Sequence, residues 1–389
     1  MDVFVAGGGM ILQDQILPSL YQLQRNGLVG SITVCARNQS TLDALLNTEK
    51  IRRAFPSSSF TGMVGSFDDV MYDLVPGNLA IVALPDQLHY AAVMQALAQE
   101  QHVVCVKPLV LKVSESEAIE KESRARGRLV AVEYHKRLDD RSLMARQRYR
   151  AGLFGDFRLG TAILFEKWYY RHSNFQNWFT KENSDAFTYI GCHYVDLVSF
   201  ITGLKPRAVS VHGIADKFPN GNEGWLWTDA RVIFENDACL NVQNALGYPD
   251  AGPGPNVQGL TMYCSGVSED GVPVGGMLRH SDQYRGLEYC YVRNPGGDGA
   301  TIYHEPSPDY FQYVDLGTEG IVPVGYGLRS IEFAVKQAIR VEASADRGKA
   351  MEEIDAAGIL ATPSNSRYNE QVVEAARHSI AAGGKLVRI

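Results

Sequence analysis

Several signals that would place a protein in a special class are missing from this sequence. No apolar run reaches the roughly 18 residues that a membrane-spanning helix needs. The six cysteines are dispersed singly, so there is no CxxC pair of the kind that binds zinc or carries redox chemistry. Lysine clusters are sparse and the net charge is −7, which argues against the phosphate backbone of nucleic acid as a ligand. We therefore expect no membrane span, no nucleic-acid partner and no metal site.

A secretion signal is also missing. Residues 1–5 enter a strand-like run at once, with neither a basic segment nor a cleavage site. Single cysteines inside apolar runs are typical of reduced, buried thiols, so we expect a cytoplasmic protein. Hydrophobic residues make up 45% and charged residues 21% of the 389 positions. These are ordinary values for a globular chain, and the length predicts two or three domains.

The first motif present is a strand, a glycine turn and a helix. Residues 3–6 are apolar and lead into Gly7-Gly8-Gly9-Met10, after which leucine and isoleucine recur on one helix face. Gly7 and Gly9 would permit a tight turn and let backbone N–H groups approach a pyrophosphate, with Met10 at the helix start. Leu12 stands at the third glycine position of GxGxxG. A plain strand-to-helix turn is the alternative interpretation.

The second strand-like run, at residues 31–35, ends without an acid. Nicotinamide-binding folds place an acidic residue there to bind the adenosine ribose hydroxyl, whereas this chain has Ala36 followed by Arg37. A small residue leaves room for a 2′-phosphate, and a guanidinium can bind it. We therefore expect NADP or NAD, with NADP slightly favoured. Stacking of Arg37 on adenine, indifferent to the phosphate, is the alternative.

Strand-like and helix-like segments alternate through the first third of the chain. Further strands are expected at residues 61–64, 79–84, 103–106 and 129–132, with helices between them. Repeated strand–helix units predict a doubly wound parallel sheet. We expect it to form a dinucleotide-binding domain over residues 1–135.

Lys107 stands where an apolar strand stops. Val103 to Val106 have strand propensity, and Pro108 cannot continue a central ladder because it lacks an N–H. The ammonium group is therefore expected at the carboxyl end of a strand, the edge where open α/β sheets bind ligands. Such a lysine is a candidate proton donor, proton acceptor or anchor. The alternative is a solvated loop lysine.

Four segments, in this order, resemble the Gfo/Idh/MocA family of oxidoreductases, which includes glucose–fructose oxidoreductase and inositol dehydrogenase. They are Leu84–His89, the run HVVCVKPL at 102–109, Val132–Arg137 and Gly191–Asp196. The usual EKP of the family is VKP here, with Val106 in place of the acid, while Lys107 is retained.

The resemblance implies a fold, a cofactor and ligand contacts. An N-terminal Rossmann domain would be followed, over residues 136–389, by an α+β domain for substrate binding and oligomerisation, with a large open, mainly antiparallel sheet. A nicotinamide nucleotide would be the cofactor. The residues implied at the nucleotide are Leu84, Pro85, His89 and Lys107, and those implied at the substrate are Tyr134 and His135.

An aromatic stretch follows the first expected strand of the second domain. It includes Trp168 and, a little later, Trp178 and Phe179. Aromatic faces with interspersed polar groups suit a sugar or polyol, because the C–H faces stack and the hydroxyls need hydrogen bonds. An ordinary packed loop or a subunit interface is the alternative.

Residues 187–202 have helical spacing, which places Tyr189, His193 and Asp196 on one face. By itself a lone histidine is more often structural. In enzymes of the resembling family, the matching helix supplies a histidine and, four residues earlier, an aspartate beside the substrate. Tyr189 occupies that earlier position here, and an unperturbed phenol is a poor base. Asp185, one turn further back, could substitute.

From residue 207 onward the chain reads as strands broken by glycine and proline turns, with helices at the end. One face of such an antiparallel sheet commonly needs a partner, so we expect a homo-oligomer, a dimer or tetramer. His280, Tyr284 and Arg285 could reach a ligand, but no pattern places them.

These observations predict an NAD(P)-dependent oxidoreductase acting on a hydroxyl or keto carbon of a small-molecule sugar, polyol or glycoside. Lys107 and His193 would hold the reacting oxygen, and Tyr189 would position a neighbouring hydroxyl or join the proton relay. One alternative is a redox-neutral glycosidase or lyase-type enzyme with a tightly bound nucleotide, which the tyrosine could suit. Another is a non-catalytic nucleotide-binding sensor, for which the valine in VKP is weak support.

Overall fold

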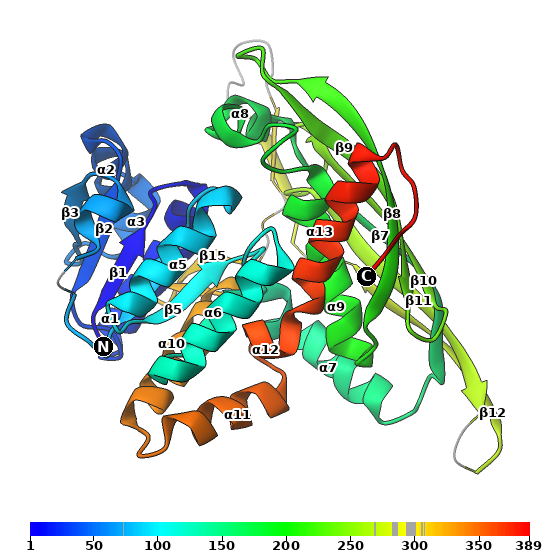
Figure 1. The fold of residues 1–389 in the computed structure, drawn as a ribbon. Helices are drawn as coiled ribbons and strands as arrows, with labels where there is room; N and C mark the ends of the chain where they lie inside the picture. Colours follow the sequence, from blue (N-terminus) through cyan, green and yellow to red (C-terminus); the bar gives the residue numbers. More distant parts are fainter. Residues whose placement is uncertain (73, 268–269, 282–286, 293–300, 305, 307) are drawn as a thin grey trace. The chain divides into compact units, whose positions relative to one another are not determined.

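The computed structural model describes residues 1–72, 74–267, 270–281, 287–292, 301–304, 306 and 308–389. It contains two compact units (Figure 1). Unit 1 comprises Met1–Asp140 and Tyr313–Glu374, and unit 2 comprises Arg141–Gln312 and Ala375–Ile389.

Unit 1 is built on a six-stranded parallel sheet with the order β3-β2-β1-β4-β5-β6. Its strands are β1 (Val3–Ala6), β2 (Ile32–Ala36), β3 (Thr61–Val64), β4 (Leu79–Val82), β5 (His102–Val106) and β6 (Val130–Glu133). β1 and β4 are buried throughout. The strand order reverses between β1 and β4, which is where such sheets bind ligands at their carboxyl ends. This sheet confirms the predicted doubly wound parallel fold.

Helices and short strands complete unit 1. They are η1 (Leu12–Ile16, π-helical), α1 (Leu17–Arg25), α2 (Gln39–Leu46), α3 (Glu49–Ala54), α4 (Phe67–Val70), η2 (Asp86–Leu88), α5 (His89–Ala98), α6 (Val113–Arg126), η3 (His135–Leu138), β15 (Gln312–Asp315), η6 (Gly317–Glu319), β16 (Ile321–Val324), α10 (Tyr326–Ala343), α11 (Arg347–Ala357) and α12 (Pro363–Ser366).

The extent of unit 1 differs from the predicted domain over residues 1–135. Residues 313–374, expected in a second domain over 136–389, belong to unit 1 instead. The physical reason is the apolar face of α10, whose Ile331, Val335 and Val341 are at most 1% exposed and share one core with β1 and β4. A helix so far along the chain gives no local sign of the sheet on which it packs.

Unit 2 is built on a seven-stranded sheet with the order β12-β11-β7-β10-β9-β8-β17. Its strands are β7 (Asp156–Lys167), β8 (Pro206–Lys217), β9 (Glu223–Phe234), β10 (Cys239–Tyr248), β11 (Val257–Val267), β12 (Pro273–Ser281) and β17 (Val387–Arg388). Only β7 and β10 pair in parallel among the described strands of this sheet, so the predicted mainly antiparallel sheet is confirmed. A separate hairpin pairs β13 (Tyr289–Val292) with β14 (Thr301–His304).

The helices of unit 2 lie against one face of its sheet. They are α7 (Asp140–Arg150), η4 (Trp168–His172), α8 (Phe175–Trp178), η5 (Phe187–Gly191, π-helical), α9 (Cys192–Thr202) and the later part of α13 (Tyr368–Ala381), in which the division between the units falls. Figure 1 shows α9 and α13 beside the strands, and the hydroxyl of Ser379 in α13 accepts the N–H of Val211 in β8 at 2.8 Å.

The opposite face of the sheet is open. Tyr263 in β11 pairs in register with Leu159 in β7 and Met277 in β12, and these three side chains are 50%, 50% and 56% exposed. By contrast, every described residue from Cys192 to Ile201 in α9 is buried. The sheet therefore has one packed face and one face in contact with solvent, which carries this row of apolar side chains.

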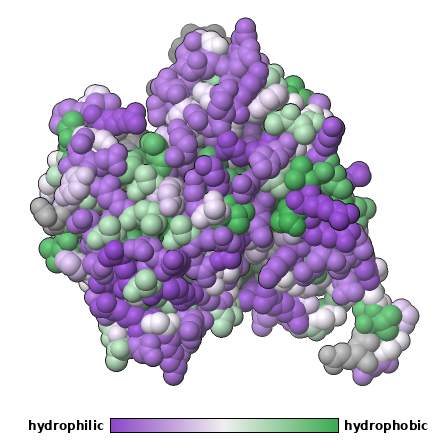
Figure 2. Space-filling model, viewed as in Figure 1, coloured by the Kyte–Doolittle hydropathy of each residue, from purple (hydrophilic) through white to green (hydrophobic). Residues whose placement is uncertain are grey.

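The molecular surface carries no large apolar belt in the view of Figure 2, where hydrophobic residues form separate small patches among hydrophilic ones. No helix within the described ranges combines the length and apolar character required to cross a membrane. No disulfide joins the described cysteines. Cys35, Cys105, Cys192 and Cys264 are buried, whereas Cys239 is partly exposed and Cys290 is exposed.

Candidate functional site

The glycine turn after β1 has the geometry that a close backbone approach requires. Gly7 has φ +116°, and a Cβ there would lie 2.1 Å from the carbonyl oxygen of Ala83. Gly9 is exposed, and a Cβ on it would meet no atom within 4 Å. Its carbonyl accepts the N–H groups of Leu12 at 3.1 Å and Gln13 at 3.2 Å, and Met10 is partly buried beside it. The backbone at Gly9 is thus open, at the start of a helix, as a pyrophosphate site needs.

The end of β2 presents one cation. Ala36 is buried, whereas Arg37 is exposed and makes no hydrogen bond or ion pair with any other described residue. Asn38 starts α2 and accepts the N–H of Thr41 at 2.9 Å. The guanidinium of Arg37 is therefore available to an anion, which is compatible with the predicted 2′-phosphate contact.

His89 joins the loops that follow β4 and β5. Its ring is fully buried between two carbonyl oxygens, with Nδ1 2.8 Å from Pro108 and Nε2 2.8 Å from Leu84. Leu84 and Pro85 are partly exposed beside it. His89 therefore links the two loops through their backbone carbonyls, and its predicted contact with the nucleotide stays a prediction. Lys107 is partly buried at the carboxyl end of β5, and its peptide bond to Pro108 is cis.

A buried carboxylate organises the end of β6. Glu133, 6% exposed, accepts hydrogen bonds from the amide of Gln15 at 2.7 Å and the hydroxyl of Ser330 at 2.6 Å, and Nδ1 of His135 lies 3.1 Å away. The His135 ring stacks on Tyr326 with the ring centroids 5.6 Å apart. His135 is thus oriented from both sides.

Sequence reasoning missed three of these partners. Ser330 and Tyr326 come from α10, and nothing in their local sequence indicates this contact. Gln15 carried a weak signal, since it is a polar residue inside an apolar helical run. Tyr134, expected at the substrate with His135, is 2% exposed, and the guanidinium of Arg137 lies 5.9 Å from its ring.

In unit 2 the predicted helix over 187–202 begins with a π-helical turn. The N–H of Cys192 bonds back to Phe187 across five residues before α9 continues regularly. The wider turn changes the backbone around Tyr189, and the face expected to be shared by Tyr189, His193 and Asp196 stays a prediction. His193 and Asp196 are 5% and 2% exposed.

Asp185 is occupied by helix capping. One carboxylate oxygen accepts the N–H of Thr188 at 2.8 Å, and the other accepts its hydroxyl at 2.6 Å. The side chain is 2% exposed. These bonds cap the start of the helix, and the predicted place of Asp185 beside the substrate stays a prediction.

Tyr189 lies among aromatic rings. Its ring centroid is 4.8 Å from Phe175, 5.9 Å from Phe179 and 6.1 Å from Trp178. Tyr170, whose ring is 5.4 Å from Phe175, joins the same group, and burial raises the pKa of its phenol well above the ordinary value. Both phenols can offer hydrogen bonds, and Tyr170 stays protonated at all physiological pH values.

Trp168 is not in that group. It is 41% exposed, and the guanidinium of Arg171 lies 4.0 Å from its ring. Arg171 also pairs with Asp216 at 2.7 Å, and this hydrogen bond lowers the pKa of the Asp216 carboxyl. Trp168 therefore packs against Arg171, and its predicted contact with the substrate stays a prediction.

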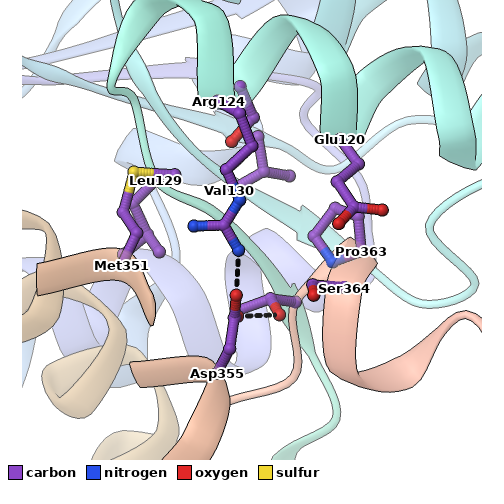
Figure 3. Close-up of a pocket in the computed structure, with 10 residues that line it drawn as sticks. Glu120, Arg124, Leu129, Val130, Met351, Asp355, Pro363 and Ser364 are labelled. Carbon is purple, nitrogen blue, oxygen red and sulfur yellow. Dashed lines mark hydrogen bonds and ion pairs between the residues drawn. The ribbon is translucent and has the colours of Figure 1, made fainter. Parts of the chain in front are cut away.

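A pocket in unit 1 lies apart from the residues discussed so far. It is lined by Glu120, Ser123, Arg124, Leu129, Val130, Met351, Asp355, Thr362, Pro363 and Ser364. Figure 3 shows Arg124 and Asp355 pointing toward each other as an ion pair, and the Thr362 hydroxyl also donates to Asp355. No predicted site residue lines it. Arg124 pairs with Asp355, and Glu120 pairs with Arg367 outside the pocket, so we assign the pocket a structural role.

Two further points concern the expected ligands. In the part of the chain that the structure describes, no group of three or more histidine, cysteine, aspartate or glutamate side chains could hold a metal ion. Tyr284 and Arg285 lie outside the described residues. His280 is 3% exposed, with Nε2 3.2 Å from the hydroxyl of Ser142, which gives it a packing partner in α7.

Comparison with known proteins places both halves of the chain in one family. Residues 1–134 match the model described as an oxidoreductase family with an NAD-binding Rossmann fold, and residues 142–254 match a GFO/IDH/MocA C-terminal domain. Together these matches cover more than half of the chain.

Among curated proteins, the chain is 26% identical over 172 residues to scyllo-inositol 2-dehydrogenase (NADP(+)) IolW of Bacillus subtilis, covering 44% of this chain and 46% of that protein. The chain thus aligns with about half the length of the curated relatives it matches, or less.

Among solved structures, GenD2 from gentamicin A biosynthesis in complex with NAD has a TM-score of 0.70 at 15% identity, covering 100% of this chain and 96% of that one. Levoglucosan dehydrogenase in complex with NADH and levoglucosan has a TM-score of 0.66 at 17% identity, covering 100% and 99%. Likeness at this level of identity concerns the fold alone.

Proposed function

Because this chain belongs to the Gfo/Idh/MocA family of oxidoreductases, as its motifs predicted, we propose that it transfers hydride between a nicotinamide nucleotide and a hydroxyl- or keto-bearing carbon of a sugar, polyol or glycoside. The observation that carries the proposal is the position of Lys107. It stands at the carboxyl end of β5, on the same edge of the parallel sheet as the open glycine turn after β1. That edge is where such sheets bind nucleotides and act on their substrates.

The residues at this edge fit a nicotinamide nucleotide. The open backbone at Gly9 would accept the pyrophosphate, and Leu84 and Pro85 would lie against the nucleotide. When bound, the nicotinamide supplies the hydride acceptor or donor that the protein lacks. Arg37 supports NADP over NAD because its guanidinium is exposed and unpaired among the described residues.

The remaining steps fall to the protein's own side chains. We assign to Lys107 and His193 the holding of the reacting oxygen, with one of them accepting the hydroxyl proton when the substrate is oxidised. Positioned proton transfer of this kind typically contributes about 10²–10⁴ in rate. His135, held by Glu133 and Tyr326, would donate to a substrate hydroxyl, and Tyr189 would do the same from η5.

A redox-neutral glycosidase or lyase is the second candidate. It is favoured by one observation: a phenol stands at Tyr189, where the resembling enzymes carry a carboxylate. In that case a nucleotide retained by the protein would oxidise the sugar transiently and reduce it again after the substituent leaves. Product analysis separates the two candidates, because only this one gives a hydrolysed sugar without net reduced nucleotide.

The test is spectroscopic. Purified protein is mixed with NADP⁺ or NAD⁺ and a panel of sugars, polyols and glycosides, and growth of the near-ultraviolet band of reduced nicotinamide is followed. We expect growth with at least one substrate, faster with NADP⁺. Lys107→Met should lower turnover by at least about 10²-fold while nucleotide binding persists. Lys112→Met is the matched control, since the Lys112 side chain is 64% exposed and pairs with Glu115. Near-normal turnover in Lys107→Met would remove Lys107 from the mechanism.

We also propose that the chain forms a homo-oligomer through the open face of the unit 2 sheet. The exposed row of Leu159, Tyr263 and Met277 supports this, because a second copy would bury it. Light scattering should give a mass of two or more chains, and Leu159→Glu should shift it toward one chain. A monomeric wild-type protein would contradict the proposal.

A further inference from the structure

The rings around Tyr189 form one continuous group, which we call the aromatic wall: Tyr170, Phe175, Trp178, Phe179 and Tyr189. Phe175 is its centre, with ring centroids 5.4 Å from Tyr170, 5.2 Å from Trp178 and 4.8 Å from Tyr189. All five residues belong to unit 2. They come from η4, α8 and η5 and from the residue that follows α8, so three separate segments of chain converge on them.

The wall has a buried base and an accessible front. Phe175 and Phe179 are 6% and 0% exposed, whereas Tyr170, Trp178 and Tyr189 are partly exposed. The indole N–H of Trp178 makes no hydrogen bond to any other described residue and is not among the buried polar atoms. The front therefore offers ring faces together with at least one hydrogen-bond donor, and Tyr189 lies on the helical segment that leads to His193.

The wall differs from a site built for a bare polyol. Carboxylate and amide side chains can form hydrogen bonds with two adjacent hydroxyls of a polyol. None of the five wall residues has a carboxylate, and both carboxylate oxygens of Asp185, the acid nearest in sequence to Tyr189, accept hydrogen bonds from Thr188. Aromatic faces also pack against other rings in offset or edge-to-face contact, so the wall suits an aromatic ring as well as the C–H face of a sugar.

Building on the proposed function, we propose that the aromatic wall binds an aromatic substituent of the substrate, so that the preferred substrate is a glycoside with an aromatic aglycone rather than a free sugar or polyol. The sugar would be presented to His193 and the aglycone ring would pack against Trp178 and Tyr189. An aromatic pair of this kind strengthens binding by about two- to tenfold beyond the simple burial of area.

The experiment compares phenyl β-glucoside with methyl β-glucoside, which differ only in the aglycone, using the full chain with NADP⁺ or NAD⁺. The readout is the ratio of kcat/KM for phenyl over methyl substrate. We expect a ratio of about ten in the wild type, carried mainly by KM. Trp178→Leu should bring the ratio close to one, and Trp178→Phe, which keeps a ring, should retain most of it. A wild-type ratio of one, or a ratio that survives Trp178→Leu, would overturn the proposal.

A binding measurement separates this proposal from the proposed function. Calorimetric titration of phenyl β-glucoside requires no turnover, so it tests the wall even if no substrate is oxidised. If the phenyl glucoside binds more tightly than the methyl glucoside, and Trp178→Leu removes this difference, the aromatic wall binds the aglycone ring whether or not the substrate is oxidised. Oxidation of polyols and methyl glucosides with no phenyl preference in rate or binding would leave the proposed function in place and contradict the wall.

Discussion

Each unit begins a site helix with a π-helical turn, but the two turns are held differently. In unit 1, η1 brings the buried amide of Gln15 to Glu133, to the carbonyl of Gly327 at 3.2 Å and to the hydroxyl of Ser330 at 3.4 Å. In unit 2, η5 ends at Gly191, where a Cβ would lie only 2.4 Å from the amide oxygen of Asn244 in β10.

The difference is between a polar tether and a steric fit. Asn244 is 1% exposed, and neither its oxygen nor its nitrogen has a hydrogen-bond partner among the described residues. Its contribution to η5 is therefore its close packing against a glycine, whereas Gln15 acts through directed hydrogen bonds. We therefore expect the η1 turn to lose stability when the hydrogen-bond donor of Gln15 is removed. The η5 turn should lose stability when an atom is added at Gly191. Substitutions at the two turns should thus have distinct signatures.

The largest effect is expected just before η1. Gly7→Ala would place a Cβ 2.1 Å from a backbone oxygen at φ +116°, and backbone cannot move aside cheaply. We expect a loss of about 4 kcal/mol or more in the free energy of unfolding, measured by denaturant titration. Gly9→Ala is the control, because a Cβ there meets no atom within 4 Å. It should leave stability within about 0.5 kcal/mol and affect nucleotide binding instead. Equal stability of Gly7→Ala and Gly9→Ala would contradict the close approach of Gly7 to the Ala83 carbonyl.

The next effect tests the steric fit at η5. Gly191→Ala would also bring a Cβ within 2.8 Å of the buried ring of Phe187, so we expect a loss of about 3 kcal/mol. Shortening the neighbour should relieve part of the clash, so the double variant Gly191→Ala/Asn244→Ala should be more stable than Gly191→Ala alone. Strict additivity of the two single losses would show that Asn244 does not press on Gly191.

The polar tether at η1 should respond to loss of a donor. Gln15→Leu keeps the volume roughly constant but leaves the buried carboxylate of Glu133 without one hydrogen bond, at a cost of about 2–3 kcal/mol. Denaturant unfolding measures the loss. Leu12→Met, at another fully buried position of η1, is the control for general repacking and should cost less than about 1.5 kcal/mol. A neutral Gln15→Leu would show that the tether is dispensable.

The smallest effect is expected at His102, at the amino end of β5 in the parallel sheet of unit 1. At the start of β5, Nδ1 of His102 accepts the N–H of Leu129 at 2.9 Å, and Nε2 lies 3.0 Å from Glu342, which also pairs with Arg128 and Arg347. Burial lowers the pKa of His102 to about 4. The neutral ring is therefore the form that stabilises the fold. Its contribution is complete above the unfolded pKa near 6.5 and is lost as the pH falls toward 4.

Between pH 7 and pH 5 this linkage should cost roughly 2 kcal/mol of unfolding free energy. The measurement is the denaturant midpoint as a function of pH, and His102→Gln should flatten the dependence over that interval. An unchanged slope in His102→Gln would assign the pH dependence to other groups.

Local patterns were enough to predict most of unit 1. The glycine turn, the buried strands and the position of Lys107 follow from short-range rules, because Gly7, Pro108 and the apolar runs act on their immediate neighbours. The Gln15–Glu133–Ser330 network was not predictable, since it joins residues from three distant segments. The packing of α10 in the core of unit 1 was not predicted for the same reason.

The site in unit 2 was less accessible to sequence reasoning. A helix over 187–202 was predicted from its apolar spacing, but a single π turn leaves almost no trace in that spacing, so the π-helical start of the helix was not predicted. The aromatic stretch was recognised, yet its sequence does not show which ring packs against Arg171 and which against Phe175. Such choices are decided by tertiary packing. The strand β12, rich in glycine, likewise lacks the usual strand composition.

The most direct test of hydride transfer is isotopic. A glycoside deuterated at its ring carbons is incubated with the protein and oxidised nucleotide, and the nucleotide is examined by mass spectrometry and by NMR at nicotinamide C4. We expect one deuterium on C4 of the reduced nucleotide in the wild type and almost none with Lys107→Met. Oxidised sugar accompanied by unlabelled reduced nucleotide, with the deuterium released to water, would contradict the mechanism.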